Sequence, residues 1–250
     1  QWLVQGVGSG DVLFFHFSGH GAQVPDQTGL EADGLNETIL PLDYKAKQIT
    51  DDELWGTLVY PLPDGVRMTC VMDCCHSGTG LDLPFEFDYK NKNKHQMSSR
   101  QRWIEDINPA HSRGDVVLFS GCKDDQTSAD VQSMREAGGA MTNSFIKAYQ
   151  KNNHTTYNDF LDLIHKQIKK GHYSQRPQLT SSQPFDVDKR IFSFVEGIES
   201  NSNELVGRLK RKHIKPASGS TSSGGKFDID DILFGGALAA VATAFGGMRW

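Results

Sequence analysis

Three short apolar segments mark the chain, and each has the length of one β-strand. They cover residues 11–17 (DVLFFHF), 67–73 (RMTCVMD) and 115–121 (DVVLFSG). Their apolar residues follow one another without strict alternation, which is typical of strands buried on both faces of a parallel sheet. A buried helix is the alternative, but the segments are too short and too closely flanked by glycine for it. The pattern therefore predicts three strands of a largely parallel sheet.

Helical patterns lie between and after these strands. Residues 50–53 (TDDE) form a capping-box sequence ahead of an apolar stretch, which predicts an amphipathic helix. Apolar residues recur at helical spacing over 145–149 and 157–168, and 178–181 and 190–195 are candidates for closing strands. Strands that alternate with helices predict an α/β fold, with a mostly parallel sheet and helices on both faces.

Two segments break this pattern. Residues 89–113 are polar and rich in Lys and Arg, and we expect them to form a basic surface linker. Residues 198–250 have the composition of a flexible tail, with a basic cluster, a Ser/Gly-rich stretch and a small-residue apolar stretch at 232–245. This last stretch is too short and too rich in glycine to predict a membrane span.

The composition narrows the class of protein. The 250 residues carry 26 Lys and Arg against 31 Asp and Glu, a net charge of −5, and 37% of them are hydrophobic. We therefore expect a soluble globular protein, and the net acidity argues against a nucleic-acid partner. Four clustered cysteines, with Cys74 and Cys75 adjacent, point to reduced thiols in a reducing compartment. The first residues show neither a signal-peptide pattern nor an initiator Met, so we expect a cytoplasmic protein whose sequence is truncated at the N-terminus.

Reactive side chains follow each of the three predicted strands. His20 comes after the first strand, Cys74 and Cys75 come after the second, and an acidic segment with a cysteine, 122–125, comes after the third. The carboxyl ends of parallel strands meet at one edge of a sheet, so these groups are expected to converge. An imidazole beside a thiol favours the nucleophilic thiolate, which predicts a Cys–His hydrolytic site. The backbone amides of Gly21 and of the nucleophilic cysteine are candidates to hold a developing oxyanion.

Other interpretations of these residues remain open. Spacing does not choose between Cys74 and Cys75, because neighbouring side chains leave a strand end in opposite directions. A lone loop histidine is usually structural, and it is the pairing with a cysteine that favours catalysis for His20. His16 and His76 are expected to be structural. A zinc site formed by His16, His20 and one of the thiols is the less favoured alternative.

Three motifs resemble those of the metacaspases, which are caspase-related cysteine peptidases of plants, fungi and protists. Residues 17–21 (FSGHG) resemble the catalytic-His motif, 73–78 (DCCHSG) the catalytic-Cys motif and 120–130 (SGCKDDQTSAD) the small-subunit signature. The separation of 55 positions between His20 and Cys75 fits the caspase-type order. The resemblance implies a caspase-like three-layer sandwich, and the short segment before the small-subunit signature resembles the type I order.

The resemblance also implies roles for individual residues. Cys75 is then the nucleophile, because it directly precedes His-Ser-Gly, and His20 is the general acid and base. The oxyanion donors are the amides of Gly21 and Cys75. Ser18 and Asp73 line the primary specificity pocket, where a carboxylate suits a substrate with Arg or Lys before the cut bond. The alternative for Asp73 is a strand-end carboxylate that caps a following turn.

Many metacaspases need calcium, and the acidic residues that match their metal site are Asp51, Asp52 and Asp82, with a further position in the 33–37 loop. Asn36 stands there, where an acid is usual. Calcium takes six to eight oxygen ligands, and an amide oxygen can be one of them. The resemblance therefore implies calcium as an activating cofactor. The alternative is that Asp51 and Asp52 only stabilise the start of a helix, where negative charge is favourable.

The same resemblance divides the chain into four parts. Residues 1–88 form a large-subunit part that lacks its N-terminal end, 89–113 the linker with candidate self-cleavage sites, 114–197 a small-subunit part and 198–250 the tail. The expected partners are protein or peptide substrates with Arg or Lys before the cut bond. We expect a monomer that associates with neither nucleic acid nor membrane. The alternatives are a prokaryotic-type caspase-like peptidase and a catalytically silent scaffold of the same fold.

Overall fold

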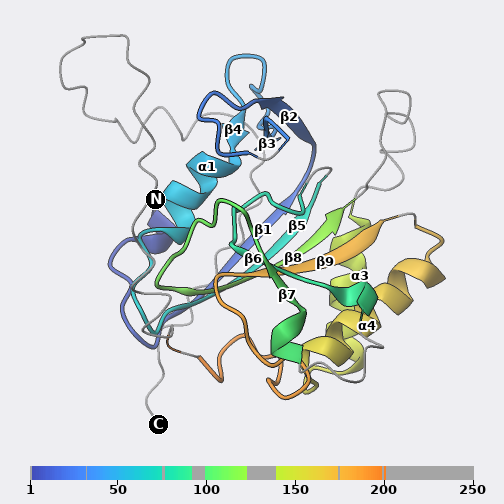
Figure 1. Ribbon diagram of the computed structural model, residues 1–250. Helices are drawn as coiled ribbons and strands as arrows, with labels where there is room; N and C mark the ends of the chain where they lie inside the picture. Colours follow the sequence, from blue (N-terminus) through green and yellow to red (C-terminus); the bar gives the residue numbers. More distant parts are fainter. Residues whose placement is uncertain are drawn as a thin grey trace.

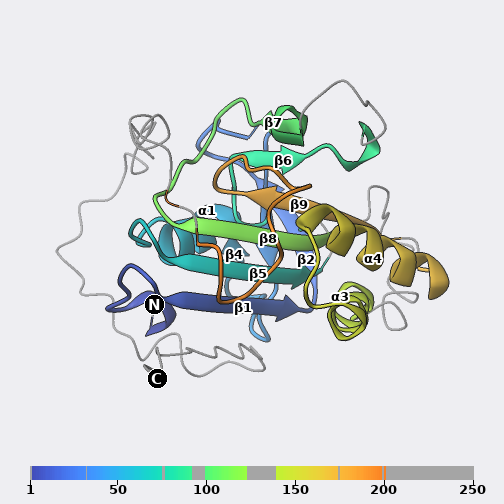
Figure 2. The same cartoon turned by 90° about the horizontal axis from the view of Figure 1, so that it is seen from below.

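The computed structural model describes residues 2–31, 33–74, 77–91, 99–122, 139–173, 175–198 and 200. Its main sheet consists of β1 (Val12–Ser18), β5 (Arg67–Asp73), β6 (Phe85–Phe87), β7 (Trp103–Glu105), β8 (Asp115–Cys122) and β9 (Arg176–Ser181). The strand order is β1-β5-β8-β9-β6-β7 (Figure 2). β1, β5 and β8 are parallel, and β6 runs with them, while β9 and β7 run in the opposite direction. The predicted mostly parallel sheet is confirmed.

Helices cover both faces of this sheet (Figure 1). The helical elements are α1 (Asp51–Leu54), π-helical η2 (Trp55–Val59), α3 (Ala140–Lys151), α4 (Tyr157–Lys170) and the short turns η1 (Trp2–Val4), η3 (Tyr89–Asn91) and η4 (Ser99–Arg102). Val71 and Phe119 of the central strands pack with α3 and α4, whereas Phe15, Cys70 and Leu118 pack with α1 and η2. Both faces are therefore buried, which explains why these strands are continuous apolar segments. Among the helices of the described residues, none combines the length and hydrophobicity of a membrane span.

A smaller antiparallel sheet follows β1 in sequence. Its strands are β2 (Gly21–Pro25), β3 (Leu35–Ile39) and β4 (Ile49–Thr50). β4 leads directly into α1, and the predicted capping box is confirmed. Thr50 Oγ1 accepts a hydrogen bond from the Glu53 amide at 3.2 Å, and Glu53 Oε2 accepts one from the Thr50 amide at 3.3 Å. The cap fixes the first turn of α1, which carries Asp51 and Asp52.

The predicted closing strand at 178–181 is confirmed as part of β9, but the one at 190–195 is wrong. That segment makes a single isolated bridge to the residue before α4. Phe192 inserts instead into an aromatic cluster and stacks on Phe160 of α4, with ring centroids 4.1 Å apart. The apolar residues of the segment pack on the helical layer, which produces a strand-like pattern without a sheet partner.

The segment expected to be a basic surface linker, 89–113, also contributes to the sheet. Residues 92–98 of it lie outside the described residues, but Trp103 opens the edge strand β7, is buried, and donates its indole N–H to a backbone carbonyl at 2.8 Å. Arg102 is buried as well, with its guanidinium 4.3 Å from the centre of the Phe87 ring. A guanidinium can pack on an aromatic ring, so a basic composition does not by itself place a segment on the surface. The division of the chain into subunit-like parts stays a prediction.

A buried ionic cluster fixes the end of the described chain at the amino ends of the central strands. Arg67 opens β5 and Asp115 opens β8, both are fully buried, and they form an ion pair at 2.7 Å. Arg190 pairs with the same carboxylate. The Arg67 guanidinium also donates to the carbonyls of Ser193 and Glu196 at 3.1 and 3.3 Å. The chain after Arg190 is therefore held at the amino edge of the sheet.

Candidate active site

The carboxyl ends of β1 and β5 meet, as the sequence predicts for the reactive motifs that follow them. Ser18 and Asp73 are the last residues of these strands and are register partners, and the Gly19 amide donates to the Asp73 carbonyl at 3.2 Å. Ser18 is exposed and Asp73 is buried. The two residues predicted to line a specificity pocket therefore lie side by side at this edge.

His20 leaves this edge in the turn between β1 and β2. Its carbonyl accepts a hydrogen bond from the Leu40 amide at 2.9 Å, and Gly21 then starts β2. A side chain at Gly19 would bring its Cβ to within 2.8 Å of the Phe17 ring, so this turn requires a glycine. The His20 imidazole is exposed, which leaves it accessible for proton transfer.

The predicted nucleophile, Cys75, lies outside the described residues, as does His76. The pairing of Cys75 with His20 therefore stays a prediction, and so does the oxyanion role of its amide and of the Gly21 amide. Cys74, the residue before it, is 5% exposed and packs with the side chains on the α1 face of the sheet. Cys74 thus occupies a structural position, which leaves Cys75 as the better candidate of the two thiols.

Ser77 anchors the turn that follows the Cys motif. Its side chain is fully buried, and its hydroxyl lies 2.9 Å from the Cys74 carbonyl and 3.0 Å from the Gly121 carbonyl. Gly121 belongs to β8, so this contact joins the Cys turn to the third parallel strand. The small-subunit signature continues at 123–130, outside the described residues.

Asp73 is held by the elements on the α3 face. It is 4% exposed; its Oδ2 accepts a hydrogen bond from the Thr142 amide, in the first turn of α3, at 2.7 Å, and its Oδ1 accepts one from Gln175 Nε2 at 3.4 Å. The carboxylate therefore caps the helix α3, which arrives from elsewhere in the chain. The alternative, in which Asp73 caps the turn directly after β5, stays a prediction, because part of that turn lies outside the described residues. No cationic side chain of the described residues forms an ion pair with Asp73. A buried charge of this kind favours the binding of a cation.

His16 is structural, as the sequence predicts. Its Nε2 lies 3.0 Å from Thr142 Oγ1 on the α3 face, and burial lowers the pKa of its imidazole against the opposing effect of Asp73. Cys74 packs on the opposite face of the sheet. The zinc alternative is therefore unsupported for His16 with Cys74, and its version with Cys75 lies outside the described part of the chain.

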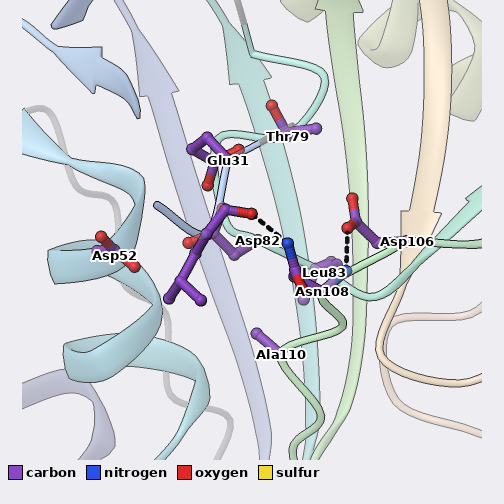
Figure 3. A pocket seen from close by; sticks show the side chains of 9 residues that line it. Glu31, Asp52, Thr79, Asp82, Leu83, Asp106, Asn108 and Ala110 are labelled. Atoms are coloured by element: carbon purple, nitrogen blue, oxygen red, sulfur yellow. Dashed lines mark hydrogen bonds between the residues drawn. The ribbon is translucent and has the colours of Figure 1, made fainter. Parts of the chain in front are cut away.

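A cavity lined by acidic residues lies beside α1 (Figure 3). It has a volume of about 60 Å³ and is enclosed by Leu30, Glu31, Asp52, Thr79, Asp82, Leu83, Asp106, Asn108 and Ala110. Glu31, Asp51 and Asp82 each bring a carboxylate oxygen to within 4.8 Å of the others. Within the residues that the structure describes, these three form the one group with this metal-ligand geometry.

Hydrogen bonds fix both Asp51, which lies beside this cavity, and part of the cavity wall. Asp51 is fully buried, and its two oxygens accept from the amides of Glu37 at 2.7 Å and of Asp52 at 2.8 Å. Asn108 Nδ2 donates to the Leu30 carbonyl at 2.6 Å, which ties the segment after β7 to the loop that carries Glu31. Segments distant in sequence thus position the carboxylates.

Burial and mutual repulsion raise the pKa of these carboxyl groups. Burial is the largest cause in each case, and it raises the pKa of Asp51 to about 8 and that of Glu31 to about 7. The pKa of Asp82 is raised well above its ordinary value by burial and then by the charge of Asp51, and the pKa of Asp52 is also raised. The cluster therefore favours either bound protons or a bound cation.

Asn36 adds an unusual oxygen to this region. Its side chain is 8% exposed, and its Nδ2 donates to Asp52 Oδ2 at 3.4 Å. Its Oδ1 is buried and accepts no hydrogen bond from any residue that the structure describes. Of the metal ligands predicted from the sequence, Asp51 and Asp82 belong to the tight group and Asp52 lines the same cavity. Glu31 is the member that sequence reasoning missed, because only the fold brings its loop against Asp82.

Comparisons with known proteins agree on one family. The profile of the metacaspase, peptidase C14 domain matches residues 1–84. "Metacaspase-5" of Trypanosoma brucei brucei is 41% identical over 224 residues, which is 86% of this chain and 44% of that protein. "Metacaspase-1" of Mycosarcoma maydis is 39% identical, over 75% of this chain and 56% of that protein. The chain spans about half the length of these curated relatives.

A solved structure is also similar. It is a protein of Geobacter sulfurreducens with a TM-score of 0.48 and 26% sequence identity, and the match covers 77% of this chain and 75% of that one.

Proposed function

Because this chain belongs to the metacaspase family, we propose that it is a cysteine endopeptidase that cuts peptide bonds after Arg or Lys by means of Cys75 and His20. The observation that carries this proposal is the meeting of β1 and β5 at one edge, with Ser18 beside Asp73 and an exposed His20 directly after them. The motif that contains Cys75 begins at this same edge.

The reaction needs a nucleophile, a proton carrier and oxyanion donors. The Cys75 thiol passes its proton to His20, and the thiolate sulfur attacks the scissile carbonyl carbon. The amides of Gly21 and Cys75 hold the oxyanion that forms. His20 then gives the proton to the leaving amine as the C–N bond breaks, and an acyl-enzyme remains. Water, deprotonated by His20, attacks the acyl carbon and releases Cys75 as the thiol.

Specificity for a basic residue rests on Asp73. Its carboxylate is buried at the carboxyl edge and bears a negative charge without an ion-pair partner among the described residues. The cationic head of a substrate Arg or Lys supplies that partner, and charge-assisted hydrogen bonds in a partly dry site are strong. Ser18 is the register partner of Asp73 and is exposed beside it, which supports Ser18 as the neighbouring wall of the proposed pocket.

Calcium is the proposed activator, and the acidic cavity is its proposed site. The donor set fits a hard cation: Glu31, Asp51 and Asp82 converge within 4.8 Å, and the buried Asn36 Oδ1 accepts no hydrogen bond from the described part of the chain. When bound, calcium would neutralise the mutual repulsion of these carboxylates. The chain's own contribution is the set of backbone amides that orient Asp51 and the Asn108 bond that closes the cavity wall.

Peptide cleavage tests the proposal directly. Fluorogenic peptides that end in Arg, Lys or Asp are incubated with the wild-type chain, with and without calcium, and with Cys75→Ala, Cys74→Ala and His20→Ala. We expect calcium-dependent cleavage after Arg and Lys that disappears in Cys75→Ala and His20→Ala and persists in Cys74→Ala. A folded wild-type chain without activity in any condition would instead support the silent scaffold. Stoichiometric zinc in the purified protein would favour the zinc site.

A further inference from the structure

Gln175 reaches the active-site edge from the later half of the chain. It directly precedes β9, whose first residue, Arg176, pairs with Cys122 at the carboxyl end of β8. Its Nε2 donates to Asp73 Oδ1 at 3.4 Å across 102 positions of sequence. No motif in the sequence singles out this glutamine, and only the antiparallel return of β9 brings it to Asp73.

The other end of this side-chain amide has no hydrogen-bond partner among the described residues. Gln175 Oε1 is buried, and no described residue donates a hydrogen bond to it. The orientation of the amide is fixed by chemistry, because the NH2 group must face the Asp73 carboxylate and the oxygen must therefore face away. A Cβ on Gly121 would lie 3.2 Å from this oxygen and 3.0 Å from Met141 Cβ, so the glycine lets the amide of Gln175 approach the end of β8 closely. A buried acceptor without a donor is unfavourable until a ligand supplies one.

We propose that Gln175 is a specificity-determining residue of the primary pocket, in which its Oε1 accepts a hydrogen bond from the guanidinium of a substrate Arg while Asp73 takes the charge. This inference rests on the proposed function and extends it. Gln175 also orients the carboxylate through its Nε2, so one residue supplies a donor to Asp73 and an acceptor to the substrate.

Two separate acceptors select Arg over Lys. A guanidinium presents five N–H donors in a planar fork and can serve the carboxylate and the amide oxygen together. The ammonium of Lys is a compact charge, and the Lys side chain is shorter than that of Arg. Most of its binding energy in the pocket should therefore come from the Asp73 carboxylate alone. Loss of the amide oxygen should therefore weaken Arg cleavage more than Lys cleavage.

The test compares two peptides that differ only in Arg or Lys before the cut bond. Gln175→Leu removes both polar atoms and is expected to lower kcat/KM for the Arg peptide by about 10- to 100-fold, the range for one hydrogen bond to a charged group. The Lys peptide should lose less, so the Arg-to-Lys ratio falls. Gln175→Glu keeps an acceptor and should retain more Arg cleavage than Gln175→Leu. Gln150→Leu, on the exposed face of α3, is the matched control and should leave the ratio unchanged.

The outcomes separate this inference from the proposed function. If the wild type cleaves after Arg and Gln175→Leu keeps the same Arg-to-Lys ratio, the role of Gln175 is overturned and the peptidase stands. If the wild type cleaves after neither residue, both are overturned. Should Gln175→Leu fail to fold, Gln175→Asn carries the test, because it keeps the amide but withdraws its oxygen by one methylene. An unchanged ratio in that variant overturns the inference, and a lowered ratio supports it.

Discussion

Glu31, Asp51 and Asp82 bring three carboxylates together beside one small cavity, so we expect a single substitution among them to change both stability and the proposed calcium response. Removing one charge should relieve repulsion in the metal-free protein while it deletes a ligand. The first effect should stabilise the metal-free protein, and the second should remove the stabilisation by calcium. Measurements of stability with and without calcium can therefore separate them.

Asp82→Asn is expected to raise the free energy of unfolding of the metal-free protein by about 1 kcal/mol at pH 7.5. The same variant should lose the stabilisation by calcium, which in the wild type is expected to reach about 2.7 kcal/mol at a hundred times the Kd. Urea unfolding with EGTA or with calcium measures both quantities. Asp188→Asn, at an exposed position, is the control. A calcium response of wild-type size in Asp82→Asn would contradict this assignment.

The raised pKa values also predict how pH acts on the metal-free protein. Glu31, with a pKa of about 7, and Asp51, with a pKa of about 8, hold protons more tightly in the folded than in the unfolded chain. Their stabilising contribution is present below the ordinary carboxyl pKa near 4 and is lost as pH rises through 7 and 8. The Tm in EGTA should therefore fall between pH 5 and pH 8.5.

Calcium affinity should rise over the same pH interval, because the metal must displace those protons. Titration calorimetry at pH 6 and pH 8 checks this, and Glu31→Gln should flatten the Tm profile. A Tm in EGTA that stays constant across the interval, or rises, would refute the pKa assignment.

At the scale of elements, Asp73 connects the end of β5 to the start of α3 and so has a structural and a proposed functional role. Asp73→Asn retains an acceptor for the Thr142 amide but removes the charge. We expect it to cost about 0.5–1 kcal/mol of stability, as for a lost charge at a helix start. The same change should lower kcat/KM for Arg peptides by about 100-fold or more.

The comparison with Asp73→Ala separates the two roles. Asp73→Ala also removes the acceptor, so it should be less stable than Asp73→Asn while showing a similar loss of activity. Thermal unfolding and peptide kinetics on both variants measure the two effects. If Asp73→Asn cleaved Arg peptides as fast as the wild type, Asp73 would have a structural role as a helix cap and no role in specificity.

At the scale of the whole molecule, the Arg67–Asp115–Arg190 cluster joins three distant parts of the chain. Removing one partner of a buried ion pair leaves an uncompensated charge, so Asp115→Asn is expected to cost about 3–5 kcal/mol in the free energy of unfolding. Urea denaturation gives the value. Lys189→Ala removes an exposed cation that pairs with Asp186 and should change stability by less than about 1 kcal/mol. If Asp115→Asn and Lys189→Ala lowered the free energy of unfolding by similar amounts, the buried cluster would contribute no more to stability than an exposed ion pair.

Local patterns predicted the parts of this fold that local physics determines. The central strands were predictable because burial on both faces leaves continuous apolar segments, and the capping box because its two hydrogen bonds lie within four residues. The segment at 190–195 was wrongly predicted to be a strand, because its apolar pattern arises from aromatic residues that pack on helices. Trp103 was missed because basic residues surround it in the sequence.

The residues of the candidate site likewise fall into those that the sequence could predict and those that it could not. Ser18 and Asp73 end two neighbouring parallel strands and His20 closely follows the first of them, so their convergence at one edge was predictable from topology. Glu31 and Gln175 were not predictable, because their partners lie 51 and 102 positions away, at Asp82 and Asp73. Pairwise contacts at such separations depend on the register of the finished sheet.

The cluster around Arg67 has a practical consequence for handling the protein. It secures the last described segment at the amino edge of the sheet, whereas Ser18 and Asp73 mark the opposite edge. A fluorescent reporter or surface tether attached after residue 198 would therefore start near the amino edge of the sheet, away from Ser18 and Asp73. Immobilised in this orientation, the protein would present to solvent the edge of the sheet that carries Ser18 and Asp73.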